Sequence, residues 1–240
     1  MDGFSYSDIF ATKGIEYLII IAFLAILIPF TMILNRQVKI TRQVQQSLGN
    51  LTSKIIRIPQ GLFFSRNHTW IFMEKSGTAR VGLDDLLLHI TGEVTLTSLR
   101  SPGEVICKGD LLTEIDQQGK TLQVLSPVSG TIVTANEMLT HNPALLNEDP
   151  YGNGWVYKIK PTNWISEVKS CYLAEEATIW SASELVRFKD FLASTMQNHS
   201  PEASMVILQD GGELCDHTLS ALPGEIWKEF QQDFLCLYRV

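Results

Sequence analysis

The residue types that most often carry out chemistry are scattered through this sequence rather than clustered. No cysteines form a Cys-x-x-Cys pair, and no histidines have the spacing of metal ligands. The sequence also contains no Ser-His-Asp set and no glycine-rich phosphate loop. We therefore predict no catalytic residue, no metal site and no enzymatic activity. The residues considered are Cys107, Cys171, Cys215, Cys236, His68, His89, His141, His199 and His217.

One lysine stands in a predicted hairpin turn, where its amine would be exposed at a tip. The stretch Gln118-Gly119-Lys120-Thr121 separates two apolar runs and has the composition of a two-residue turn. Gly119 would supply the positive φ angle of the first central position, and Lys120 would take the second. A polar lysine in such a turn needs no further explanation, so the turn by itself predicts no chemistry.

The elements that would present this turn are predicted between residues 62 and 164. Short apolar runs alternate there with turn signals, as in TARVGL, DLLTEI, TLQVL and WVYKIK. Short strands at such spacing predict a small all-β barrel or sandwich. Asp84 and Asp85 precede an apolar run and are expected to cap a short helix. Trp70 and Trp155 are expected in the core.

An uncharged apolar segment precedes this domain. Residues 17–34 cover about 27 Å at ~1.5 Å per residue, close to the ~30 Å hydrocarbon core of a bilayer. This predicts a transmembrane helix over 17–34, after a short external N-terminus over 1–16. Residues 35–61 contain bases and no acid, which predicts a basic juxtamembrane stalk and a cytoplasmic main domain. The expected location is the inner membrane, crossed once. The alternative, a cleaved signal peptide, is disfavoured by the acidic residues of the leader.

Composition limits the classes of partner. The 240 residues carry a net charge of −7, from 26 acidic and 19 basic residues. This excludes nucleic acid as the main partner, because phosphate binding needs a basic surface.

Residues 165–240 predict a small α+β extension with a helix near each end. Its aromatic residues Trp227, Phe230 and Phe234 either pack internally or form a docking surface for another subunit.

Two stretches of the middle domain carry distinctive motifs. Residues 63–99 contain His68-x-Trp70, and residues 126–161 contain SPVSG and NEDPYGNGW. Through these motifs the chain resembles the glycine cleavage system H protein family. The resemblance implies a barrel-sandwich hybrid, in which a lysine at a hairpin tip carries lipoate on an amide bond. The lipoyl arm of that family carries an aminomethyl group and electrons among partner enzymes.

The resemblance also indicates where that lysine would stand. In the family it lies a fixed distance before the serine of SPVSG, and counting back from Ser126 reaches Gly119. Lys120 is the nearest lysine, and a shift of one residue turns a side chain to the other face of a strand. Two interpretations stay open. Lys120 is either an unmodified turn residue, with no cofactor on the chain, or a displaced site of lipoate attachment.

Three functions follow as hypotheses. The first is a membrane-tethered, non-catalytic H-protein-like scaffold or accessory subunit that docks to a cytoplasmic or membrane redox assembly. The second is a lipoyl carrier of glycine-cleavage type with lipoate on Lys120. The third is the adaptor of an export pump, which the inward orientation disfavours. The partners expected are proteins of a membrane-associated complex, and the bilayer through residues 17–34 and the basic stalk.

Overall fold

The computed structural model divides the chain into two units, residues 1–49 and 50–240. It describes residues 17–27, 29, 50–51, 53, 55–98, 100–199 and 214–235. Each unit is described by itself.

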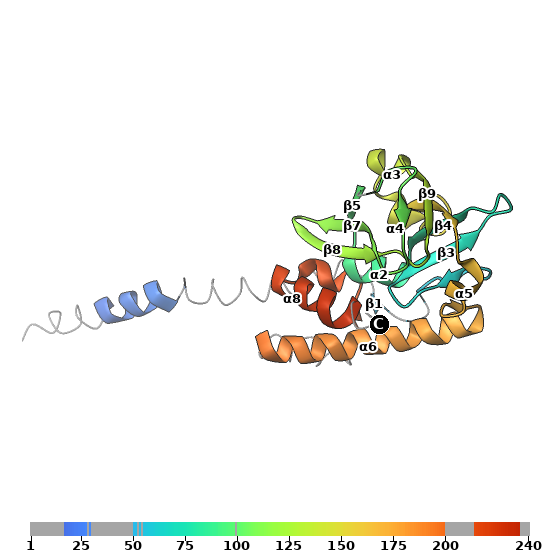
Figure 1. Ribbon diagram of the computed structural model, residues 1–240. Coiled ribbons are helices and arrows are strands. Elements are labelled where there is room, and N and C mark those ends of the chain that lie inside the picture. The colour runs from blue at the N-terminus through green and yellow to red at the C-terminus, as the bar shows by residue number, and fades with distance from the viewer. Residues whose placement is uncertain are drawn as a thin grey trace, which may run out of the picture. The chain divides into compact units, whose positions relative to one another are not determined.

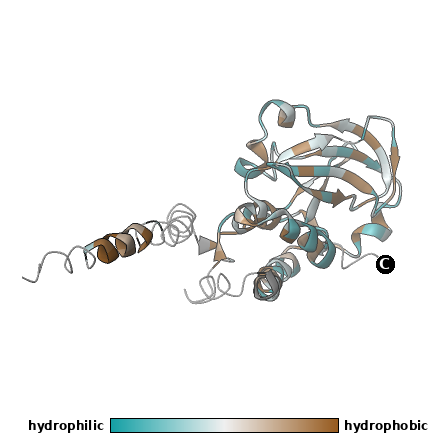
Figure 2. Ribbon diagram, turned by 90° about the vertical axis from the view of Figure 1, so that its left-hand side faces the viewer, coloured by the Kyte–Doolittle hydropathy of each residue, from teal (hydrophilic) through white to brown (hydrophobic). Residues whose placement is uncertain are grey.

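The first unit contains an apolar helix over residues 17–27 (Figure 2). Among the residues that the structure describes, no helix is both long enough and apolar enough to cross a membrane. The prediction of a transmembrane helix over 17–34 is therefore wrong, and so is the single-pass inner-membrane location that depends on it. Residues 35–49 of the expected stalk lie outside the described residues.

A β-sandwich forms the centre of the second unit (Figure 1). One antiparallel sheet has the strand order β11-β2-β3-β4-β10-β9-β6, and a smaller sheet has the order β5-β7-β8. This architecture fits the β-sandwich expected from the short apolar runs. The strands of the larger sheet are β2 (Phe63–Phe64), β3 (Thr69–Met73), β4 (Ala79–Leu83), β6 (Val105–Ile106), β9 (Gly130–Ala135), β10 (Tyr157–Pro161) and β11 (Tyr172–Leu173). Those of the smaller sheet are β5 (Thr95–Ser98), β7 (Leu111–Gln117) and β8 (Lys120–Leu125).

Trp70 occupies the interior of the larger sheet, as expected. Its side chain is fully buried, and its partner across the β3–β4 ladder is Gly82. A Cβ atom on Gly82 would lie 2.6 Å from the indole ring. The absence of a side chain at Gly82 therefore provides the space in which the indole packs.

We expect a Gly82→Ala substitution to lower the free energy of unfolding by about 1–3 kcal/mol, because overpacking a rigid core forces neighbours to move. Urea unfolding measures the loss. A Gly82→Ala/Trp70→Phe double variant is the matched control, since a smaller ring removes the clash. Its loss should be smaller than the sum of the two single losses. Additive losses would show that the ring and Gly82 do not restrict each other.

The sandwich carries four short helices, which are α2 (Asp85–Thr91), α3 (Met138–His141), α4 (Leu145–Glu148) and α5 (Trp164–Val168). Helix α2 begins where the sequence predicts a cap. Oδ1 of Asp84 accepts a hydrogen bond from the backbone N–H of Leu87 at 2.8 Å, which satisfies one of the unpaired donors of the first turn. The expected helix cap is confirmed.

The C-terminal extension packs against the sandwich. Its elements are α6 (Glu175–His199), β12 (Leu214–Cys215), η1 (Thr218–Ala221), α8 (Gly224–Glu229) and the π-helical turn η2 (Phe230–Leu235). Strand β12 pairs with β1 (Asn50–Leu51). Helix α6 runs under the sandwich in Figure 1, and α8 packs against the edge strand β8. The side chains of Trp227, Phe230 and Phe234 are buried, so they pack internally; Phe230 and Phe234 stack with ring centroids 4.7 Å apart.

Candidate functional site

The hairpin between β7 and β8 ends in a two-residue turn. Gln117 pairs with Lys120 in the ladder, so Gln118 and Gly119 are the central residues. Their φ angles are 54° and 84°, the left-handed values that a type I′ turn requires at both central positions. The turn therefore lies one residue earlier than the sequence predicts. Gly119 occupies the second central position, and Lys120 is the first residue of β8.

Gly119 is the exposed point of the hairpin. A Cβ atom built on it would have no other atom within 4 Å. A side chain at position 119 would therefore project freely into solvent, and the residue that occupies this position has no side chain.

Lys120 lies beside the tip, and its side chain is held by the C-terminal extension. The ammonium Nζ donates hydrogen bonds to the backbone oxygens of Ser220 at 2.6 Å and Leu222 at 3.3 Å. It also lies 5.2 Å from the ring centroid of Trp227, within the range of a cation–π contact. Burial lowers the pKa of the Lys120 amine. The hairpin lysine is thus part of the packing between β8 and the extension.

An acyl group on Lys120 does not fit this arrangement. An amide nitrogen keeps one N–H, so it could not donate to both the Ser220 and Leu222 carbonyls. The acyl chain would also need the space next to Trp227, whose side chain is 1 % exposed and whose indole N–H donates to the Leu219 oxygen at 2.8 Å. Attachment of lipoate would require the Lys120 amine to leave the Ser220 and Leu222 carbonyls.

A buried ion cluster joins the sandwich to α6. His68 is fully buried and has a φ angle of 56°, in the turn before β3. Its Nδ1 lies 2.9 Å from Oδ2 of Asp84, and its Nε2 lies 3.5 Å from Oε2 of Glu184 on α6. Burial disfavours the charged imidazole, but the two carboxylates outweigh it and raise the pKa of His68 to about 9. His68 is therefore a cation between two carboxylates.

Aromatic and basic side chains of the extension enclose this cluster. The His68 ring stacks on Phe234 with centroids 5.5 Å apart, and Trp180 lies against it at 5.3 Å. Arg187 binds Glu184 through its guanidinium and also donates to the Phe234 oxygen. The expectation that His68 serves packing rather than catalysis agrees with these contacts. The sequence did not indicate its charge partner Glu184, which lies in the extension.

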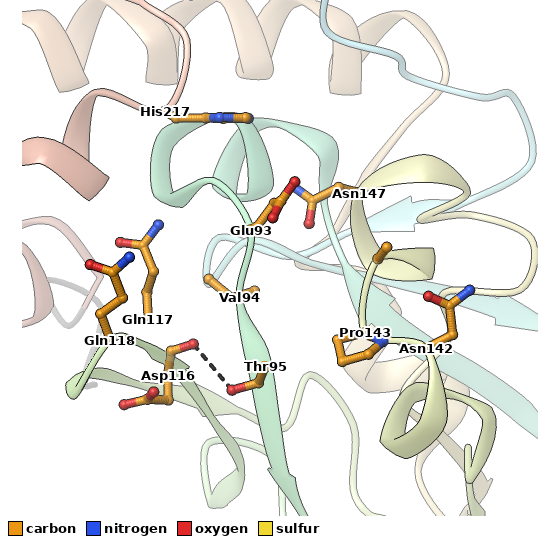
Figure 3. Close-up of a pocket in the computed structure, with 11 residues that line it drawn as sticks. Glu93, Val94, Thr95, Asp116, Gln117, Gln118, Asn142, Pro143, Asn147 and His217 are labelled. Atoms are coloured by element: carbon orange, nitrogen blue, oxygen red, sulfur yellow. Dashed lines mark hydrogen bonds between the residues drawn. The ribbon is translucent and has the colours of Figure 1, made fainter. Parts of the chain in front are cut away.

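A pocket of about 620 Å³ opens between the hairpin and α4 (Figure 3). The carboxylates of Glu93 and Asp116 line it. The side-chain amides of Gln117 and Asn147 donate to the backbone oxygens of Thr91 and Gly92. Their buried side-chain oxygens accept no hydrogen bond from any residue that the structure describes. The pocket is therefore lined by polar and acidic side chains, among them Glu93 and Asp116.

The remaining candidate residues have different surroundings. His141 is exposed at the end of α3, and His199 ends α6 with a side chain outside the described part of the chain. His89 is not isolated, because its Nδ1 lies 2.8 Å from Oδ1 of Asp216. Asp216 in turn raises the pKa of His89 to about 9, with a further contribution from Asp85. The sequence missed this contact because 127 positions separate the two residues.

Comparisons with known proteins match this part of the chain. The family model described as glycine cleavage H-protein matches residues 62–183. A probable glycine cleavage system H protein of Thermococcus kodakarensis is 38% identical over 113 residues, which cover 47% of this chain and 84% of the relative. The glycine cleavage system H protein of Psychrobacter cryohalolentis is 33% identical over 119 residues, covering 50% and 94%. The crystal structure of an H protein from Mycobacterium marinum has a TM-score of 0.41 and 29% identity, covering 44% of this chain and 87% of that one.

Proposed function

The chain belongs to the glycine cleavage H-protein family, and from this premise we propose that it is a non-catalytic, protein-binding member without lipoate on its hairpin. In this proposal the H-protein sandwich serves as a docking subunit for the protein components of a redox assembly. The family accounts for the protein partners, because H proteins work by binding other components of the glycine cleavage system. Residues from 184 onward lie outside the family match. In this proposal they cover part of the sandwich surface, including the Lys120 amine.

The observation that carries the proposal is the position of the Lys120 amine. Two backbone carbonyls of the extension accept its hydrogen bonds, and Trp227 lies under it. An enzyme that attaches lipoate needs an unhindered amine on a projecting hairpin. The residue that projects from this hairpin is Gly119, which has no amine. Both facts support a sandwich that keeps the family fold without the family's carrier chemistry.

The measurement that tests the proposal is the intact mass of the full chain, produced with a lipoate-attaching enzyme and lipoate. We expect the wild-type chain to keep its unmodified mass. A Gly119→Lys variant should gain one lipoyl group, because it places an amine at the open tip. The strain of a non-glycine residue at positive φ costs about 1–2 kcal/mol there, which a folded domain tolerates.

Two further variants make this experiment decisive. A Gly119→Lys/Lys120→Arg variant should still gain the lipoyl group, which assigns the modification to position 119. Gly119→Ala controls for the strain at the turn and should stay unmodified. A lipoyl group on Lys120 of the wild-type chain would overturn the proposal. A Gly119→Lys variant that stays unmodified would also count against the proposal. The position of the lysine in the turn would then not explain why the wild-type chain lacks lipoate.

The second candidate is a lipoyl carrier of glycine-cleavage type with lipoate on Lys120. Family membership favours it, since Lys120 is one residue from the position that carries lipoate in the family. It requires the Ser220 and Leu222 carbonyls to release the amine before acylation. The wild-type mass measurement separates the two candidates directly.

A further inference from the structure

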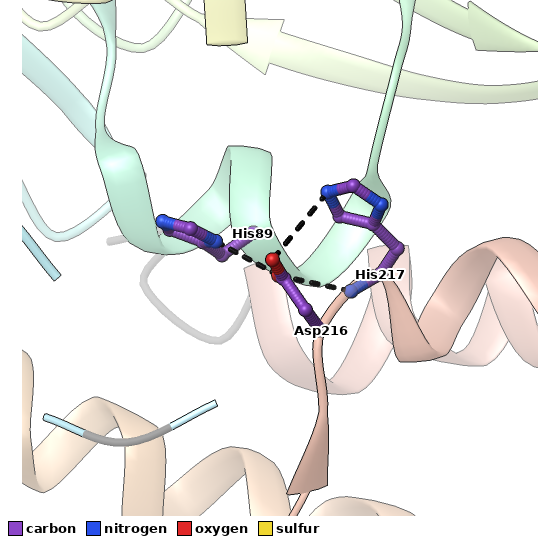
Figure 4. A group of neighbouring side chains, drawn as sticks. All are labelled: His89, Asp216 and His217. Atoms are coloured by element: carbon purple, nitrogen blue, oxygen red, sulfur yellow. Dashed lines mark hydrogen bonds and ion pairs between the residues drawn. The ribbon is translucent and has the colours of Figure 1, made fainter. Parts of the chain in front are cut away.

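A second group of chemistry-bearing side chains lies where the extension meets α2 (Figure 4). His89 belongs to the last turn of α2, and Asp216 and His217 belong to the turn after β12. One ligand atom of each residue lies within 4.8 Å of the others. Two imidazoles and a carboxylate form the donor set of zinc sites that keep an open coordination position. We propose that His89, Asp216 and His217 bind a Zn²⁺ ion.

The separations between the ligand atoms suit a tetrahedral ion. Nδ1 of His89 lies 2.8 Å from Oδ1 of Asp216, and Nε2 of His217 lies 3.7 Å from Oδ2 of Asp216. With metal–ligand bonds of 2.0–2.2 Å, neighbouring ligand atoms of a tetrahedral site are about 3.3 Å apart. Both separations differ from this value by about half an ångström, but they involve different oxygens of Asp216, so the carboxylate would bind the ion through both oxygens or rotate to present one of them. The ion takes the place of the proton that His89 and Asp216 share.

The outer ring nitrogen of His89 has the partner that zinc ligands usually have. Nε2 lies 3.4 Å from Oδ2 of Asp85, one turn earlier on α2. Arg57 holds that carboxylate, through its backbone N–H at 2.8 Å and its guanidinium at 2.8 Å. Once the ion has displaced the Nδ1 proton, a carboxylate at Nε2 holds the tautomer whose Nδ1 lone pair binds the metal. This side-chain geometry distinguishes His89 from a surface histidine.

The backbone fixes the two halves of the site against each other. The N–H of His217 donates to the carbonyl oxygen of His89 at 2.7 Å, and it also contacts Oδ1 of Asp216 at 3.0 Å. The three side chains remain 19 to 31 % exposed, so an ion can enter from solvent. His217 also lines the pocket beside the hairpin, which leaves room for a water molecule or another donor as fourth ligand.

The site is independent of the proposed docking function. Asp216 and His217 lie outside the residues that match the H-protein family, which end at 183. Zinc at this position would connect α2 of the sandwich to the extension, close to η1, whose Ser220 holds Lys120.

The test is zinc binding to the full chain after removal of metals with a chelator, in competition with a chromogenic zinc indicator. We expect one Zn²⁺ per wild-type chain. His217→Asn and Asp216→Asn should each weaken binding by at least ~10-fold to 100-fold, the loss seen when even an outer partner of a zinc ligand is removed. Asparagine tolerates the φ angle of 58° at position 217, so the backbone keeps its conformation.

His141→Asn is the matched control, since His141 is an exposed histidine of the same chain, and its zinc affinity should equal that of the wild type. Urea unfolding of the metal-free variants verifies that each is folded. The proposal fails if the wild-type chain binds no zinc at micromolar concentration. It also fails if His217→Asn binds zinc as tightly as the wild type, because the cysteine thiols would then account for the binding.

Discussion

A His68→Asn variant is expected to lose about 3–5 kcal/mol of the free energy of unfolding. His68 is the only cation in direct contact with both Asp84 and Glu184 among the described residues, and all three side chains are at most 6 % exposed. Removing His68 leaves the buried Asp84 carboxylate without a cationic partner, while Glu184 keeps Arg187, and an uncompensated buried charge accounts for losses of this size. Asparagine is chosen because it adopts positive φ angles readily, so the loss reports the missing charge rather than backbone strain. Urea unfolding followed by tryptophan fluorescence measures it.

A double variant separates the charge from the packing of the ring. In His68→Asn/Asp84→Asn the carboxylate that lost its cationic partner is also neutral, and asparagine can still cap α2, so the stability should recover in part relative to His68→Asn. His141→Asn, which changes an exposed histidine in the same way, should stay within about 0.5 kcal/mol of the wild type. A His68→Asn variant as stable as His141→Asn would show that the buried cluster contributes no stability.

The same cluster predicts a pH dependence with a definite sign. The pKa of His68 is raised to about 9 in the folded chain, against about 6.5 in the unfolded chain. A raised pKa means that the stabilisation is complete below pH 6.5 and is lost as the pH rises through about 9. The stability difference between the wild type and His68→Asn should therefore shrink over that range. A difference that grows over the same range would contradict the cationic state of His68.

A Trp227→Ala variant is expected to lose about 3–5 kcal/mol and to release Lys120. The indole is 1 % exposed, and its N–H donates to the Leu219 oxygen. Removing a buried tryptophan leaves a cavity and costs energy in this range. The substitution loosens the segment that binds the Lys120 amine. The indole holds the Leu219 carbonyl, and Ser220 and Leu222 follow it closely in the chain. Lys120 should then react several-fold faster with an amine-acylating reagent.

The acylation rate is measured by peptide mass spectrometry, relative to the exposed Lys75 of the same chain. Ile179→Ala is the control, since Ile179 is an exposed hydrophobic residue of α6 and its removal leaves no cavity. Equal Lys120 labelling in wild type and Trp227→Ala would mean that the extension does not protect the amine. That result would weaken the argument for an unmodified hairpin, whereas faster labelling supports it.

The sandwich and its local caps could be predicted from the sequence because their signals are short-range. Apolar runs and turn residues recur within a few positions, and they correctly predict strands such as β4, β7, β8 and β10, although β2, β3 and β6 were not among the predicted runs. The Asp84 cap and the buried Trp70 follow from the same kind of pattern. The hairpin was located to within one residue, but its two central residues are Gln118 and Gly119, because the ladder pairs Gln117 with Lys120. A turn's composition does not determine which residues its flanking strands pair.

The apolar segment near the N-terminus shows where composition misleads. An uncharged run over residues 17–34 satisfies a hydropathy criterion, but no helix among the described residues is long and apolar enough to cross a membrane. Hydropathy measures the preference of side chains for an apolar environment, whereas crossing a bilayer also requires a continuous helix of sufficient length.

The sequence by itself determined the family, the β-sandwich and the glycine at the hairpin tip. Only the tertiary structure decided what surrounds the side chains that could do chemistry. Lys120 and Ser220 are 100 residues apart, and His89 and Asp216 are 127 apart, yet each pair is in contact. Contacts at such separations depend on how the extension packs on the sandwich, and the hydrophobic burial that drives this packing is non-directional, so the sequence does not show which surfaces meet. The accessibility of the Lys120 amine and the contact between His89 and Asp216 are therefore decided by the fold.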